Sequence, residues 1–161
     1  MQIRGALNNC LLFTNSGVTH YGPPTPGSKH DCHPGKEDDG SDGRITLSGP
    51  EVYLSSHLAV SLGMAVHELT INAAKHGALS VIGGKVDVTW SVTIEATRSR
   101  LDFDWVESGG PPVSEPARQG FGSRLMEFVL PGQIQAKASI EYLPEGVRIR
   151  CSVPLPMEAV G

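Results

Sequence analysis

Three polar side chains that can bind a nucleotide and its metal lie on one flank of a long helical pattern. Glu68, Asn72 and Lys75 are spaced i, i+4 and i+7, so at 100° per residue they fall within a narrow arc. The amide oxygen of Asn72 is a hard ligand that suits Mg²⁺, and Lys75 can meet a phosphate as a point charge. A solvated helix flank with a Glu–Lys pair explains the spacing equally well, so the pattern alone leaves both interpretations open.

A second candidate group stands at the end of a strand-like run. The carboxylate of Glu107 is followed by the paired glycines Gly109 and Gly110, which let a flat ligand approach bare backbone. Glu107 can accept a hydrogen bond from the amino group of adenine, whereas guanine presents a carbonyl there and would be rejected. Taken alone, a plain surface turn is the more common origin of such a run.

A third group of glycines precedes a shorter helical pattern. Gly120, Phe121 and Gly122 enter this helix, where free amides and the positive end of the helix dipole suit a phosphate chain. Arg124 can add positive charge. A lone Gly-x-Gly more often marks a turn than a phosphate site. The order of the three groups along the chain is what favours a nucleotide site.

Together these motifs resemble those of one known family, the HWE histidine kinases. The stretch HELTINAAKHGALS, which begins at His67, resembles the family's N box. The family is named for a histidine in this box and for a Trp-x-Glu motif, and the chain has both, the second as Trp105 and Glu107. The two glycine boxes of the family are similar to ESGGPP, which begins at Glu107, and to GFG, which begins at Gly120. The combination is far more specific than any single box.

The resemblance covers about residues 44–156 and implies the Bergerat ATP-binding fold. It implies transfer of the γ-phosphate of MgATP to a histidine, with ATP and Mg²⁺ as cofactors. Asn72 would coordinate Mg²⁺, and Glu107 would replace the superfamily's adenine-binding aspartate. Glu68 matches the carboxylate that polarises water in hydrolysing relatives. The resemblance places Gly109 and Gly110 along the nucleotide, and Gly120 and Gly122 near the phosphates. Further candidates for binding the nucleotide are Lys75, His76, Phe121 and Arg124.

The acceptor of the phosphate is expected outside this chain. Family members carry a phosphoacceptor histidine on a two-helix dimerisation domain upstream, whereas His20, His30 and His33 here lie among turn formers. The chain is therefore expected to be a fragment, or to phosphorylate a histidine domain that passes the phosphate to a response regulator. Two alternatives remain. One is a serine/threonine kinase of the anti-sigma type, which shares the fold and the boxes, although the Trp105–Glu107 motif and His67 argue against it. The other is a non-catalytic nucleotide-sensing or interaction module. A hydrolase that depends on Glu68 is a weaker third.

The elements that position these motifs follow from periodicity. The sequence predicts an α+β, two-layer sandwich: a mixed, largely antiparallel sheet with helices on one face. Apolar residues recur at helical spacing after Ser55 or Ser56, so a long helix is expected to run to about His76 and end at Gly77. A shorter helix is expected over residues 123–130. Strands are expected over 45–47, 52–54, 86–94, 101–105, 138–142 and 147–153, with the first two around the Gly49–Pro50 turn.

Composition and the two ends of the chain complete the expectations. Residues 1–43 are rich in turn formers and charge, so we expect a low-structure tail with one short element near residues 10–13, and a second tail over 157–161. The net charge of −4 argues against a sequence-independent nucleic-acid binder. No apolar run approaches the roughly 20 residues that span a bilayer. Three scattered cysteines and the lack of a secretory pattern favour the cytoplasm.

Overall fold

A computed structural model describes residues 1–15, 43–95, 98–113 and 135–155 of the chain. Five strands form one sheet in the order β1-β2-β3-β5-β4. The elements of the chain, in order, are α1 (Ile3–Asn15), β1 (Ile45–Ser48), α2 (Ser56–Lys75), the short 3-10 helix η1 (Ala78–Ser80), β2 (Lys85–Glu95), β3 (Arg98–Ser108), β4 (Lys137–Leu143) and β5 (Gly146–Leu155).

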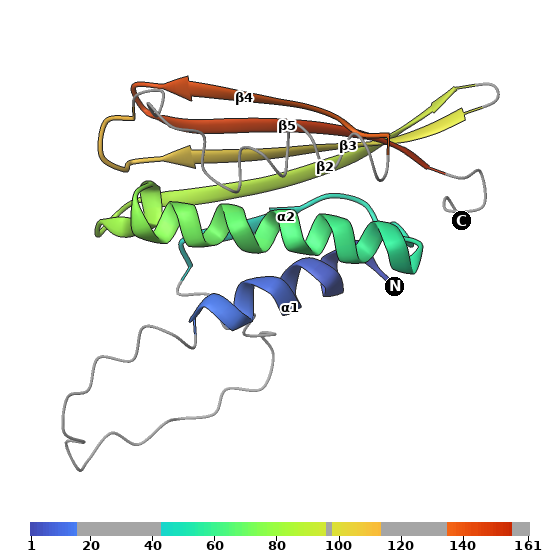
Figure 1. Cartoon of the computed structure of the whole chain (residues 1–161), viewed down its shortest axis with the longest axis horizontal. Helices are drawn as coiled ribbons and strands as arrows, with labels where there is room; N and C mark the ends of the chain where they lie inside the picture. Colours follow the sequence, from blue (N-terminus) through green and yellow to red (C-terminus); the bar gives the residue numbers. More distant parts are fainter. Residues whose placement is uncertain (16–42, 96–97, 114–134, 156–161) are drawn as a thin grey trace, which may run out of the picture.

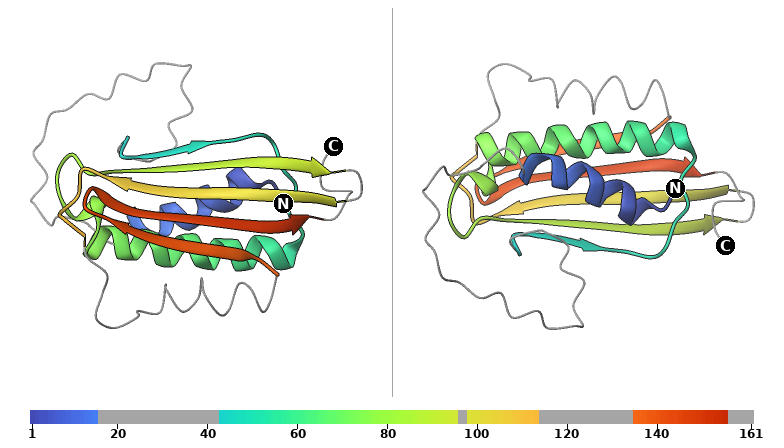
Figure 2. Two further views of the ribbon diagram at one scale, coloured as in Figure 1. Left: turned by 90° about the horizontal axis from the view of Figure 1, so that it is seen from above. Right: turned by 90° about the horizontal axis from the view of Figure 1, so that it is seen from below.

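The sheet is mixed, because β1 pairs parallel with β2 while the other neighbouring strands pair antiparallel. Both α-helices lie on the same side of the sheet, α2 beneath β5 and β4 and α1 beside it (Figure 1 and Figure 2). The predicted α+β sandwich with a largely antiparallel sheet is therefore confirmed.

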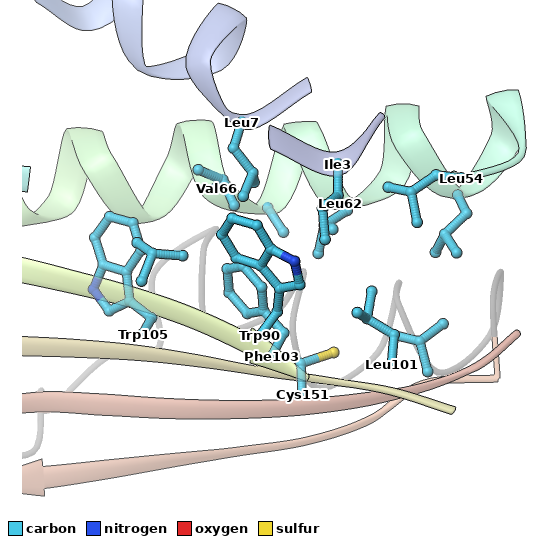
Figure 3. Packing of buried hydrophobic residues seen from close by; sticks show 14 of the residues in the cluster. Ile3, Leu7, Leu54, Leu62, Val66, Trp90, Leu101, Phe103, Trp105 and Cys151 are labelled. Atoms are coloured by element: carbon cyan, nitrogen blue, oxygen red, sulfur yellow. The ribbon is translucent and has the colours of Figure 1, made fainter. Parts of the chain in front are cut away.

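The core fills the space between α2 and the sheet. Because successive strand residues point to opposite faces, alternating apolar positions of β2 and β3 all turn toward the helices. Trp90, Phe103 and Trp105 are the largest of them, and each is buried (Figure 3). The opposite face of the sheet carries charged side chains, among them Asp104, which lies 3.6 Å from Arg148.

Helix α2 begins and ends as the sequence predicts. The Ser55 hydroxyl accepts a hydrogen bond from the Leu58 backbone N–H at 3.3 Å, which caps the helix start. At the other end, the backbone N–H groups of His76 and Gly77 both donate to the carbonyl of Asn72. The apolar stripe that faces the sheet is buried and consists of Leu58, Leu62, Ala65, Leu69 and Ala73.

Helix α1 corrects the expectation of a low-structure N-terminal segment. Ile3, Ala6 and Leu7 are buried in the main core, with Leu7 at 0% exposure. The start of the helix is also tied to the loop before α2, since the Ile3 N–H donates to the Val52 carbonyl at 2.9 Å. The expected tail over 1–43 is therefore wrong for residues 3–9, and the short element expected near residues 10–13 is part of α1. Residues 16–42 lie outside the described residues.

The expected strand over residues 52–54 is also wrong. Tyr53 forms one isolated bridge with Gln2, and β1 pairs with β2 rather than with this segment. Parallel pairing requires the chain to leave the sheet after β1, so Gly49 and Pro50 lie on a crossover instead of a hairpin turn. The helix expected over 123–130 lies outside the described residues. None of the described helices is long and apolar enough to cross a membrane.

Candidate active site

The polar flank of α2 presents the residues that the spacing singled out. Asn72 and Lys75 are exposed and Glu68 is half-buried, all in the C-terminal half of the helix. Within the described part of the chain, no hydrogen bond or ion pair engages these three side chains. The amide, the ammonium and the carboxylate are therefore available to a ligand on this flank.

The C-terminal end of α2 is joined to the end of β3 through one buried carboxylate. Glu107 is only 5% exposed, and its Oε2 accepts a hydrogen bond from the backbone N–H of Ala78 at 2.8 Å. Its Oε1 accepts one from the indole N–H of Trp105 at 3.2 Å. Both ends lie at the same edge of the molecule, on the left in Figure 1. The two sequence motifs thus meet in space.

Burial and hydrogen bonding act in opposite directions on the Glu107 carboxyl. Burial raises its pKa because the charged form loses water. The N–H groups of Ala78 and Trp105 lower the pKa by stabilising the carboxylate, and the balance leaves it raised above its ordinary value. Among the described residues no charged side chain contributes to this shift. The charge of Glu107 therefore depends on two N–H donors.

Two glycines make this junction possible because no side chain fits at their positions. A Cβ on Gly77 would lie 2.1 Å from Oε2 of Glu107 and 2.9 Å from Cα of Ala73. A Cβ on Gly110 would lie 2.6 Å from Cα of Ala78. Gly77 and Gly110 therefore let η1 approach the end of β3.

Gly109 is required for a different reason, since it has a positive φ of 69° that suits glycine. The first glycine box thus has a structural role in the packing of η1 against β3. A role of Gly109 and Gly110 along a nucleotide stays a prediction.

The remaining candidates divide into those that the structure places and those beyond its described part. His76 is exposed at the C-cap of α2. His67 is half-buried on α2, and its role stays open. Gly120, Phe121, Gly122 and Arg124 lie outside the described residues.

Sequence reasoning missed the contacts around Glu107. Trp105 was recognised as part of a motif, but not as a hydrogen-bond donor to the carboxylate two residues later. The signal that could have found it is the strand period of two, which puts positions 105 and 107 on one face. The Ala78 amide and the close approach of Gly77 have no such signal, because both depend on tertiary packing.

Comparison with known proteins shows the same kind of domain. The chain is 42% identical over 112 residues to a blue-light-activated histidine kinase of Brucella anthropi, covering 70% of this chain and 23% of that protein. It is 38% identical over 115 residues to the protein of the same name from Brucella ovis, covering 71% and 24%. The chain thus spans about a quarter of the length of these curated relatives. No family model matches the chain.

Solved structures with low sequence identity share the fold. The catalytic domain of the histidine kinase ThkA superposes with a TM-score of 0.53 at 11% identity, over 96% of each chain. The blue-light-activated histidine kinase EL346 of Erythrobacter litoralis gives a TM-score of 0.50 at 18% identity, over 70% of this chain and 35% of that one. The Bergerat fold expected from the motifs is confirmed by these neighbours. By sequence this chain carries a histidine kinase catalytic domain, and the solved structures agree with it in fold.

Proposed function

We propose that this domain is of the HWE type, binds ATP with Mg²⁺ and transfers the γ-phosphate to a histidine side chain on a partner domain. The observation that carries the proposal is the junction at Glu107, where the end of α2 meets the end of β3. It brings the polar flank of α2 and a buried, hydrogen-bonded carboxylate to one edge of the molecule. Phosphoryl transfer needs this kind of positioning more than covalent chemistry from the protein.

The donor groups suit the proposed ligands. Each oxygen of the Glu107 carboxylate accepts one hydrogen bond and retains a lone pair that can accept from the amino group of adenine. Asn72 is exposed, and its amide oxygen is of the type that Mg²⁺ prefers. Mg²⁺, when bound, neutralises charge on the phosphates.

The other residues of the site position the phosphates. Lys75 is exposed on the same flank as Asn72 and can bind a phosphate oxygen. Glu68 can orient the ligands around the metal. The remaining nucleotide contacts in this proposal come from His76, Gly109, Gly110, Gly120, Phe121, Gly122 and Arg124.

The proposed reaction is a single phosphoryl-transfer step. An imidazole nitrogen of the acceptor histidine forms a bond to the γ-phosphorus, the bond between that phosphorus and the β–γ bridging oxygen breaks, and ADP leaves. The acceptor histidine would belong to a dimerisation domain, and a response regulator would then take the phosphate. We place this exchange in the cytoplasm, where ATP is available.

The test is a transfer assay with labelled ATP. The chain is mixed with [γ-³²P]ATP, Mg²⁺ and a purified dimerisation domain from a blue-light-activated histidine kinase relative. The proposal predicts label on the histidine domain that acid removes and alkali does not. Asn72→Ala should lose the transfer, whereas His57→Ala, an exposed change at the other end of α2, should keep it.

Other results of this assay would favour the alternatives. Acid-stable label on an added protein would indicate a serine/threonine kinase. ATP binding without any transfer would indicate a nucleotide-sensing module. Steady release of free phosphate that is lost in Glu68→Gln would indicate a hydrolase.

A further inference from the structure

We propose that Trp105 is a positioning residue for base selection: its indole N–H holds the Glu107 carboxylate as an oriented, acceptor-only group that binds adenine and rejects guanine. This inference rests on the proposed ATP-binding function. It assigns a physical task to the tryptophan of the Trp-x-Glu pair, which the motif alone leaves without one.

The geometry gives Trp105 no other partner for its indole N–H within the described part of the chain. The side chain is 0% exposed, so water does not reach it. A buried indole N–H needs an acceptor, and Oε1 of Glu107 lies 3.2 Å away. Because positions 105 and 107 of β3 share one face of the strand, the spacing of the pair is what permits this bond.

The two donors to Glu107 differ in what a sequence change can do to them. The Ala78 donor is a backbone amide at the start of η1, so any residue except proline supplies it. The Trp105 donor is a side chain, and it is the one side-chain donor to Glu107 among the described residues. A substitution at position 105 can therefore remove a hydrogen bond to Glu107 and change base selection, whereas most substitutions at position 78 keep their backbone donor.

Among the described residues, no charged side chain helps to keep Glu107 ionised. At the end of α2, Lys75 and His76 are exposed. Lys85 of β2 precedes Val86, which pairs with Glu107, so it lies on the opposite face of the sheet. Arg148 of β5 also lies on that opposite face, next to Asp104. The charge of Glu107 thus depends on N–H donors, and its pKa is already raised by burial.

The protonation state of Glu107 decides which base it can pair with. An ionised carboxylate only accepts hydrogen bonds, so it matches the adenine amino group and opposes the guanine carbonyl. A protonated carboxyl carries an O–H donor and can satisfy guanine. Loss of the Trp105 N–H would raise the pKa of Glu107 further and free its side chain to rotate. Both effects weaken the preference for ATP.

Trp105→Phe removes the N–H while keeping most of the ring, and Trp90→Phe is a matched control. Trp90 is also buried and donates its indole N–H at 2.8 Å, but to the carbonyl of Pro50. The first readout is the carboxyl ¹³C NMR titration of Glu107, assigned with Glu107→Gln. Its midpoint should move to higher pH in Trp105→Phe and stay unchanged in Trp90→Phe. An unchanged midpoint in Trp105→Phe overturns the proposal without reference to nucleotide binding.

The second readout is the ratio of ATP to GTP affinity, measured by calorimetry on the whole chain. A hydrogen bond to a charged group is worth enough that Trp105→Phe should lower this ratio about tenfold, while Trp90→Phe leaves it at the wild-type value. Glu107→Gln should also lower the ratio, and adding Trp105→Phe to it should change little. A Trp105→Phe ratio within about twofold of wild type overturns the proposal.

Two further outcomes are a Trp105→Phe protein that does not fold and a wild-type chain that binds neither nucleotide. If circular dichroism shows that Trp105→Phe does not fold, the wild-type ratio is followed against pH. It should decrease as the pH falls through the Glu107 titration, and a flat ratio overturns the proposal. A wild-type chain that binds neither nucleotide contradicts the proposed function itself and with it the base-selection role, whatever the NMR titration shows.

Discussion

At the scale of single residues, the burial of Glu107 opposes the charge that its proposed function needs. It is nearly fully buried, which penalises its charge, yet the proposed adenine contact needs that charge. The N–H groups of Trp105 and Ala78 reduce the conflict without removing it, since the pKa of Glu107 stays raised.

This conflict predicts a pH dependence of stability. Because the folded pKa of Glu107 lies above the unfolded one, the folded state binds the extra proton between the two values. The free energy of unfolding of wild type relative to Glu107→Gln should therefore be highest below the unfolded pKa and fall as the pH rises through the folded pKa. Each unit of pKa difference corresponds to about 1.4 kcal/mol. Urea unfolding of both proteins from pH 4 to pH 8 measures the effect, and a relative stability that rises with pH would contradict it.

At the scale of elements, the end of α2 and the end of β3 act as one unit. The helix stops where a residue without a side chain lets Glu107 reach the Ala78 amide. A long helix, a 3-10 turn and a strand are thereby held in a fixed relation. This contact, together with the core packing of α2 on the sheet, fixes the polar flank of α2 relative to Glu107.

Gly77→Ala tests the unit directly. Its Cβ would lie 2.1 Å from Oε2 of Glu107, so the substitution should cost about 2 kcal/mol of unfolding free energy through overpacking, and should displace the carboxylate. Gly5→Ala in α1 is the matched control, since an added Cβ there would meet no atom within 4 Å apart from the backbone of its own helix. It should raise stability by about 0.5 to 1 kcal/mol through helix propensity. Equal effects of the two substitutions in chemical denaturation would refute the close contact.

At the scale of the whole molecule, α1 completes the layer that covers the sheet. It packs beside α2 and brings Ile3, Ala6 and Leu7 into the main core. The bridge between Gln2 and Tyr53 adds a backbone link to the segment before α2. Residues 1–15 are thus part of the folded domain, and stability should depend on them.

Leu7→Ala measures that dependence. The side chain is 0% exposed, so its truncation should cost about 2 to 5 kcal/mol, as for other buried leucines. Asn9→Ala, an exposed change in the same helix, should stay within about 0.5 kcal/mol of wild type. A Leu7→Ala protein as stable as wild type would show that α1 is dispensable to the core.

The sequence predicted the parts of this molecule whose patterns are long and local. Helix α2 and the alternating strands β2 and β3 follow from periodicities that packing only reinforces. The sequence predicts only a short element near residues 10–13 of α1, because Gly5, Asn8 and Asn9 dilute a stripe that becomes clear only when α2 is beside it. The segment at Tyr53 alternates over three residues, too few to distinguish a strand from an extended crossover.

The candidate site shows the same limit. The types and spacing of Asn72 and Glu107 were visible in the sequence. Of the two bonds that hold Glu107, the one from Trp105 lies within β3 and follows from the strand period, whereas the one from Ala78 depends on the packing of η1 against β3.

Calorimetric titration of the chain with ATP and with GTP, each with and without Mg²⁺, tests the central claim most directly. We expect saturable, magnesium-dependent binding of ATP and much weaker binding of GTP. Asn72→Ala should lose the magnesium-dependent part of the ATP affinity while its unfolding transition is preserved. Binding of neither nucleotide, or unaltered MgATP affinity in Asn72→Ala, would contradict the central claim.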